Sequence, residues 1–70
     1  MTKKNIQKLE SIGIDIYCID DLAKRVEKYH DGVDERYNLG FYNGYICSLY
    51  DFGMINVIEY EELSSEVEEP

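Results

Sequence analysis

The segment from about residue 33 to 52 constrains the fold more than any other part of the chain. Asp34 and Glu35 open it and Gly53 closes it, as acidic residues and glycine do at the starts and ends of helices. Projected as a helix, its apolar side chains cover about 220° of the circumference, roughly twice what a surface helix needs. Such a helix has to pack on more than one side. The sequence therefore predicts an all-α protein, a compact bundle of three to four short helices around this central aromatic-rich helix.

The remainder of this helix carries small residues. Gly40, Gly44, Cys47 and Ser48 form a ridge that another backbone can approach closely. Each glycine costs a helix about 1 kcal/mol relative to alanine, so some compensation is expected. We expect close packing against this ridge.

Two further helices are predicted before the central one. Thr2 caps a first helix that runs to about Ile12 and stops at Gly13. Asp20 and Asp21 place negative charge at the start of a second helix, which ends at the Asp-Gly pair after His30.

Residues 13–19, between these two helices, allow two interpretations. Ile14, Ile16 and Cys18 alternate with Asp15 and Tyr17, which favours a short extended connector or strand. The apolar residues also fit a three-four spacing through this segment, which favours one long helix with Gly13 inside it. The pattern leaves the segment open between strand, loop and helix.

A fourth helix is predicted at about Val57–Val67. Asn56 and Glu59 form a variant of the capping box, and Ile55 and Tyr60 stand at the positions of a hydrophobic staple. The same helix is expected to present Glu59, Glu62 and Glu66 outward. We expect residues 1–67 to form a single small domain and residues 68–70 a frayed acidic tail.

Composition supports a small folded protein and leaves open an oligomer or a partner that would help stabilise it. The chain has 70 residues, and a domain of that size buries only about 60% of its unfolded surface, so a partner or an oligomer would help it. With 44% hydrophobic residues it is too apolar for a disordered chain despite its net charge of −8. Cys18 and Cys47 show no CxxC spacing and no signal peptide precedes them, which favours free, buried thiols in the cytoplasm over a disulfide.

The residues give little support for catalysis or metal binding. His30 beside Asp31 resembles a base with its orienting acid, but a histidine at a helix end is more simply a partner of the helix dipole. One histidine and two distant cysteines do not make a structural zinc site, and there is no calcium-binding loop. We expect no enzyme, no catalytic residue, no metal and no cofactor.

Charge is the most specific compositional signal. All seven basic residues lie in the first 36 positions, whereas residues 37–70 contain seven acids and no base. This balance argues against direct binding of nucleic acid or of an anionic membrane. Most of the tyrosines suit a core, but tyrosine also adds large contact area at low entropic cost. Tyr42, Tyr45 and Tyr50 are the ones we expect to point outward or across a dimer. The candidate partner-binding residues are Asp51, Glu59, Glu61, Glu62, Glu66, Tyr42, Tyr45 and Tyr50.

In size, acidity and lack of catalytic residues the chain resembles small inhibitors encoded by bacteriophages and mobile elements, including anti-CRISPR proteins and DNA mimics. The resemblance is one of type and no residue motif carries it. It implies a viral protein that inhibits, or serves as an adaptor for, a basic nucleic-acid-binding protein, using spaced carboxylates as a DNA mimic does. The alternative is a structural homodimer, or a subunit of a larger assembly, paired through the 33–52 helix.

Overall fold

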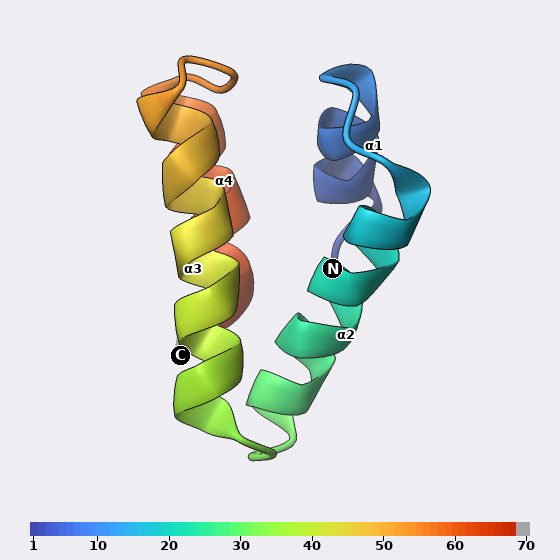
Figure 1. Cartoon of the computed structure of the whole chain (residues 1–70), viewed down its shortest axis with the longest axis vertical. Coiled ribbons are helices and arrows are strands. Elements are labelled where there is room, and N and C mark those ends of the chain that lie inside the picture. Colours follow the sequence, from blue (N-terminus) through green and yellow to red (C-terminus); the bar gives the residue numbers. More distant parts are fainter. Residues whose placement is uncertain (69–70) are drawn as a thin grey trace.

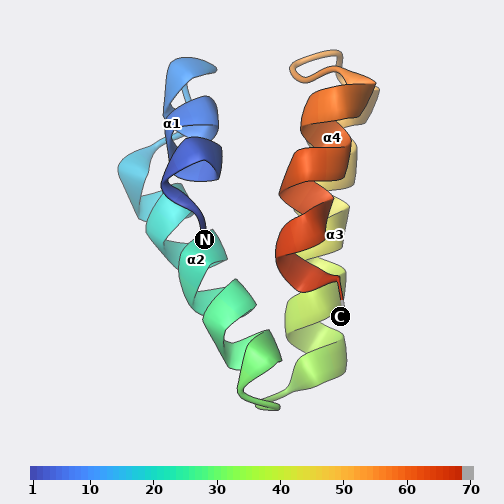
Figure 2. The same cartoon turned by 180° about the vertical axis from the view of Figure 1, so that it is seen from behind.

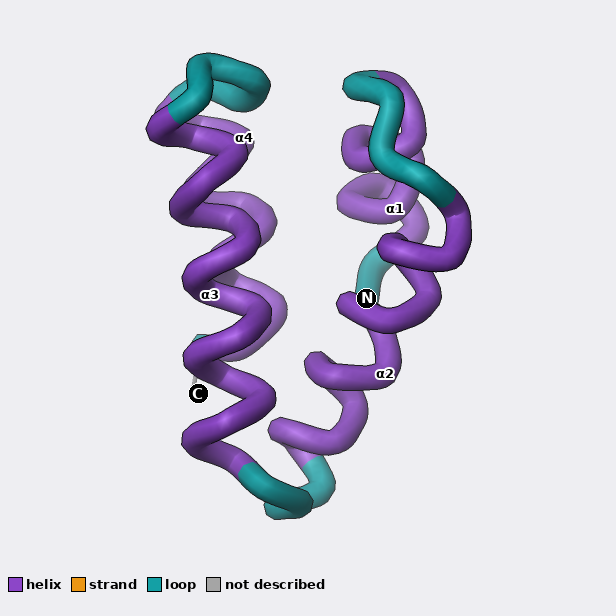
Figure 3. The backbone as a smooth tube through the Cα atoms, viewed as in Figure 1, coloured by secondary structure: helices purple, strands orange, loops and turns teal. Residues whose placement is uncertain are grey.

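The computed structural model describes residues 1–68, and every regular element in that range is a helix (Figure 3). The elements are α1 (Lys3–Ser11), α2 (Ile16–His30), α3 (Glu35–Asp51), α4 (Val57–Ser64) and a final 3₁₀ turn η1 (Ser65–Val67). Successive helices run antiparallel, so α1 and α2 form one hairpin and α3 and α4 form a second (Figure 1). Seen from behind, α1 and α4 are in front and face each other (Figure 2). The predicted all-α bundle is confirmed.

Glycine ends each of the first three helices in the same way. Gly13, Gly32 and Gly53 all have positive φ, between +74° and +89°. After α1, the Gly13 N–H donates to the Glu10 carbonyl (3.0 Å) and the next N–H reaches back to the Leu9 carbonyl (3.0 Å). This paired arrangement satisfies carbonyls that a helix end leaves open, and glycine enters the left-handed region without steric cost. The predicted stops at all three glycines are confirmed.

The helix starts are set by side-chain caps in three of four cases. The Thr2 hydroxyl accepts from the Asn5 N–H (3.2 Å). Ahead of α4, the Asn56 side chain accepts from the Glu59 N–H (2.8 Å) while the Glu59 carboxylate accepts from the Asn56 N–H (2.9 Å), which confirms the predicted capping box. Asp34, before α3, makes no such cap bond.

Residues 13–15 connect α1 to α2, and residues 16–19 form the first turn of α2, so the segment is neither a strand nor part of one helix continuous with α1. Gly13 ends α1, and the Asp15 carboxylate accepts from the Tyr17 N–H (3.2 Å), so α2 begins at Ile16. The predicted start at Asp20 and Asp21 was therefore wrong, because both lie inside α2. Asp15 is itself a good N-cap residue, so α2 begins about one turn earlier than predicted.

The core lies between α2 and α3 and is closed by one side of α1 and α4. Its buried apolar side chains are Leu9, Ile19, Leu22, Val26, Tyr29, Tyr42, Ile46, Leu49, Ile55, Leu63 and Val67. The predicted fourth helix over 57–67 is confirmed, with its last turn tightened into η1. Of the predicted tail at 68–70, Glu68 is exposed, and residues 69 and 70 lie outside the described residues.

Candidate protein-binding surface

Two of the predicted partner-binding carboxylates are directed toward α1. The Glu62 carboxylate pairs with the Lys8 ammonium (3.0 Å) and the Lys4 ammonium (3.1 Å). These two cations, Lys8 first, hold the pKa of Glu62 below its ordinary value. The Glu66 carboxylate accepts from the Thr2 N–H at 2.8 Å. The prediction that Glu62 and Glu66 point away from the bundle was wrong, because α1 lies beside the turns that carry them.

Asn5 completes this polar contact, which we name the α1–α4 clasp: Thr2, Lys4, Asn5 and Lys8 with Glu62 and Glu66. The Asn5 side chain is buried, and its amide donates to the Glu62 carbonyl (3.2 Å) and the Glu66 carboxylate (2.7 Å). A buried amide is stable only when its hydrogen bonds are made. Sequence reasoning did not single out Asn5, because nothing in its local pattern shows which helix it faces.

The other three predicted acids differ in exposure and in whether their carboxylates are already bonded. Asp51 and Glu61 are exposed, at the end of α3 and in the second turn of α4. Glu59 is half-buried and its carboxylate is engaged in the capping box. Asp51 and Glu61 are therefore the predicted acids most available to a partner.

The three predicted tyrosines occupy three different environments. Tyr42 is fully buried, and its hydroxyl donates to the Leu63 carbonyl at 2.7 Å. Burial raises the pKa of Tyr42 far above its ordinary value. The prediction that Tyr42 points outward was wrong, because position 42 lies at the centre of the α3 face that packs into the core.

Tyr45 and Tyr50 lie nearer the surface. Tyr45 is half-buried and its hydroxyl accepts from the Cys18 thiol (3.3 Å). Burial, with a smaller effect from Cys18, raises the pKa of Tyr45 to about 12. Tyr50 is exposed and its ring lies 5.3 Å from that of Tyr60. Of the three tyrosines, Tyr50 offers the most surface to a partner.

An apolar surface at the corner between α3 and α4 was not predicted. Within residues 50–58, five large apolar side chains are exposed, with Phe52 at 81% and Ile58 at 63%. We name this surface the corner patch: Tyr50, Phe52, Met54, Val57 and Ile58. It forms the end of the α3–α4 hairpin, at the same end of the bundle as the α1–α2 turn (Figure 1). Large apolar side chains gathered at one exposed place mark interaction sites more often than scattered ones do.

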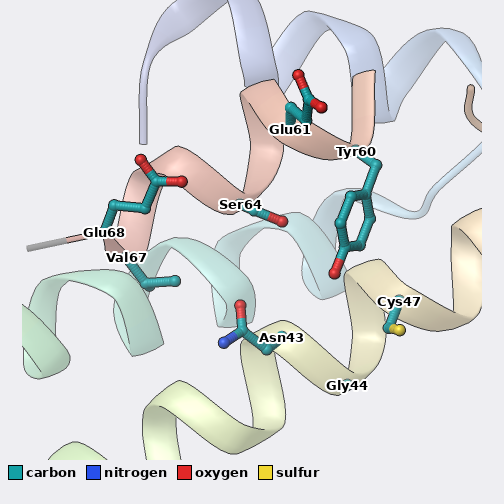
Figure 4. Close-up of a pocket in the computed structure, with 8 residues that line it drawn as sticks. All are labelled: Asn43, Gly44, Cys47, Tyr60, Glu61, Ser64, Val67 and Glu68. Carbon is teal, nitrogen blue, oxygen red and sulfur yellow. The ribbon is translucent and has the colours of Figure 1, made fainter. Parts of the chain in front are cut away.

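An open groove of about 550 Å³ lies between α3 and α4 (Figure 4). Its lining residues are Asn43, Gly44, Cys47, Tyr60, Glu61, Ser64, Val67 and Glu68. Cys18 and Cys47 are both free, as expected. The expectation that the thiols are buried was wrong for Cys47, which is exposed on the groove side of α3. The eight lining residues include carboxylates and no base. A reactive thiolate needs electropositive surroundings, which this groove does not provide.

The predicted packing against the small-residue ridge is not made within residues 1–68. A Cβ placed at Gly40 or Gly44 would meet nothing within 4 Å beyond the immediate chain and its own helix. Both positions are exposed to solvent. The compensation expected for these two glycines therefore does not come from the described part of this chain.

His30 is the last residue of α2, and its ring contacts the 3₁₀ turn η1. A ring nitrogen of His30 is hydrogen-bonded to the Glu66 carbonyl, and the ring meets the edge of Tyr29. Asp31 is the C-cap residue of α2. Within residues 1–68, His, Cys, Asp and Glu side chains nowhere gather in a group of three or more suited to a metal ion.

Comparison with protein-family models, with curated proteins and with solved structures gave no match. Among the helices of residues 1–68, none combines the length and the apolar character needed to cross a membrane. The corner patch and its neighbouring acids are thus the surface on which a functional proposal rests.

Proposed function

We propose that this chain is a small protein-binding inhibitor or adaptor, which docks its corner patch onto a basic, nucleic-acid-handling protein. The observation that carries the proposal is the exposure of five large apolar side chains within residues 50–58. They lie in the half of the chain that contains no basic residue. An apolar centre bordered by polar and charged residues is the usual layout of a specific protein interface.

The apolar residues and the acids of this surface contribute to binding in different ways. Phe52 and Ile58 supply apolar area that a partner removes from water, and such anchors usually dominate binding energy. Asp51 and Glu61 lie beside them and, with the net charge of −8, attract a partner whose own apolar hollow is bordered by Lys or Arg. Rim charges of this kind mainly raise the association rate, and their effect falls with salt.

This proposal differs from a pure DNA mimic. Glu62 and Glu66 bind α1, so the outward row of carboxylates is shorter than the sequence suggests. The corner patch, rather than a row of charges, is then the main source of affinity. We therefore expect a binding energy that salt weakens without abolishing.

The test begins with capture of a partner from bacterial lysate at low and high salt, followed by titration of the purified partner. The double variant Phe52→Ala/Ile58→Ala is expected to weaken binding by about tenfold or more, because each anchor contributes more than about 1 kcal/mol. Glu61→Lys is expected to slow association and to reduce its salt dependence.

Matched controls separate binding from folding. Val33→Ala truncates an exposed apolar side chain at the opposite end of the bundle, and Glu27→Lys reverses an exposed acid on α2. Both are expected to leave affinity unchanged within about twofold. Reversing Glu62 or Glu66 is unsuitable, because it would also open the α1–α4 clasp. Equal affinity of the double variant and Val33→Ala would refute the proposal.

A further inference from the structure

The side of α3 that carries Gly40 and Gly44 has open space at both glycines, and Gly44 also borders the α3–α4 groove beside Glu61. Along this side, α3 itself carries charge only at its two ends. From Tyr37 to Tyr50 the helix contains no charged residue, whereas Arg36 precedes this stretch and Asp51 follows it. Tyr37 is 64% exposed and Phe41 is 40% exposed. In a chain with a net charge of −8, an uncharged exposed helix face of this length needs an explanation.

The glycines on this face are not required by the isolated fold. Gly40 and Gly44 have open space where a Cβ would stand, and neither has a positive φ. Alanine would suit the helix better at both positions. Glycine there does allow a second helix to approach the α3 backbone closely, beside the neighbouring rings of Tyr37 and Phe41, whose centroids are 6.4 Å apart.

We infer that this face binds a second copy of the chain, with the two α3 helices antiparallel across a two-fold axis at Gly44. At 1.5 Å per residue, Arg36 and Asp51 stand about 12 Å and about 10 Å on either side of Gly44. The axis therefore brings Arg36 of each copy beside Asp51 of the other. When the two helices are antiparallel, the cationic end of one face lies opposite the anionic end of the other. A parallel pair would instead place like charges together.

The same register matches the other side chains. Counting outward from Gly44, Gly40 meets Ser48 of the second copy, and Tyr37 meets Asp51. Two small residues thus face each other near the axis, and a phenol faces a carboxylate that can accept its hydrogen bond. The macrodipoles of the two helices also oppose each other, which favours the pairing.

The aromatic flank is held in place before association. The Arg25 guanidinium lies 3.6 Å from the centre of the Phe41 ring and 5.2 Å from that of Tyr37. Arg25 is itself fixed by the Asp21 carboxylate (3.0 Å) and by the Asn38 side-chain oxygen (3.4 Å). Side chains that are already ordered lose less entropy on binding, so the flank suits an interface.

The test is sedimentation equilibrium of the purified chain across the micromolar range, because a single helix pair makes a small and therefore weak interface. The unchanged chain is expected to dimerise. Gly44→Leu is expected to raise the dimer dissociation constant by about tenfold or more, since it blocks the closest approach. Lys24→Leu, which adds the same side chain to an exposed position on α2, is the matched control and is expected to change nothing.

A charge exchange tests the antiparallel register. Asp51→Arg is expected to weaken the dimer by about tenfold, and the double variant Arg36→Asp/Asp51→Arg to restore it. Arg36→Asp places an acid near the N-terminus of α3, and Asp51→Arg places a base at its C-terminus. Both changes suit the helix dipole, so a weaker dimer would not be caused by unfolding. A strict monomer at all concentrations would overturn the inference, as would a dimer insensitive to Gly44→Leu or a swap that fails to restore pairing. Gly44→Leu alters neither the corner patch nor the acids beside it, so its loss of dimerisation is distinguishable from a loss of partner binding in Phe52→Ala/Ile58→Ala. The Asp51 variants change one of those acids and are therefore used to test dimerisation alone.

Discussion

Tyr42→Phe tests how far the packing of α3 against α4 depends on one hydroxyl. The substitution keeps the ring, so core volume is nearly unchanged, but it removes the donor to the Leu63 carbonyl (2.7 Å). Tyr42 is fully buried, so water cannot easily replace the lost bond. Leaving a buried acceptor without its donor costs about 1–3 kcal/mol. A 70-residue domain has a total stability of about 4–10 kcal/mol, so the loss is a large fraction.

The assay is thermal and urea unfolding followed by far-ultraviolet circular dichroism at fixed protein concentration. Tyr42→Phe is expected to lower Tm by at least about 4 °C, given the usual relation between stability and Tm for domains of this size. Tyr17→Phe removes a hydroxyl from a side chain that is 80% exposed and is expected to stay within about 0.5 kcal/mol of the parent. Equal stability of the two variants would refute the reasoning.

Three further predictions concern pH and glycine. Folding raises the pKa of Tyr42 and of Tyr45, so their protonated forms favour the folded state; stability should fall as pH rises above about 10, and less steeply in Tyr42→Phe. Folding lowers the pKa of Glu62, so its contribution is present above pH 4.5 and lost on acidification; melting curves of Glu62→Gln should lack this component. In unfolding of dilute samples, Gly44→Ala should stabilise by about 0.5–1 kcal/mol, whereas Gly53→Ala, with φ +74°, should destabilise by about 1 kcal/mol or more.

Local chemistry explains why the helix ends were predictable. A capping box involves residues three positions apart, and a glycine stop acts on the turn directly before it. Asn56 and Gly13 could therefore be interpreted without knowledge of the rest of the fold. Asp15 belongs to the same class, and its role was missed because the alternation around it was interpreted as extended structure.

The directions of side chains on each helix were less predictable. The sequence shows that α3 is apolar on more than half of its circumference, but not which arc faces α2 and which faces α4. The sequence alone therefore does not show that Tyr42 lies at the centre of the packed face. Glu62 and Glu66 depend on the position of α1, more than 50 residues away in sequence. Such contacts have no local signature.

The α1–α4 clasp also bears on how the chain is made. The Thr2 N–H is bonded to Glu66, 64 positions later, and Asn5 reaches the same carboxylate. On the ribosome, the first helix therefore has to wait for residues synthesised much later before its buried amide is satisfied. A nascent chain arrested before Glu62 could still pack α1 against α2, but the buried Asn5 amide would lack its acceptors until the last turn emerges.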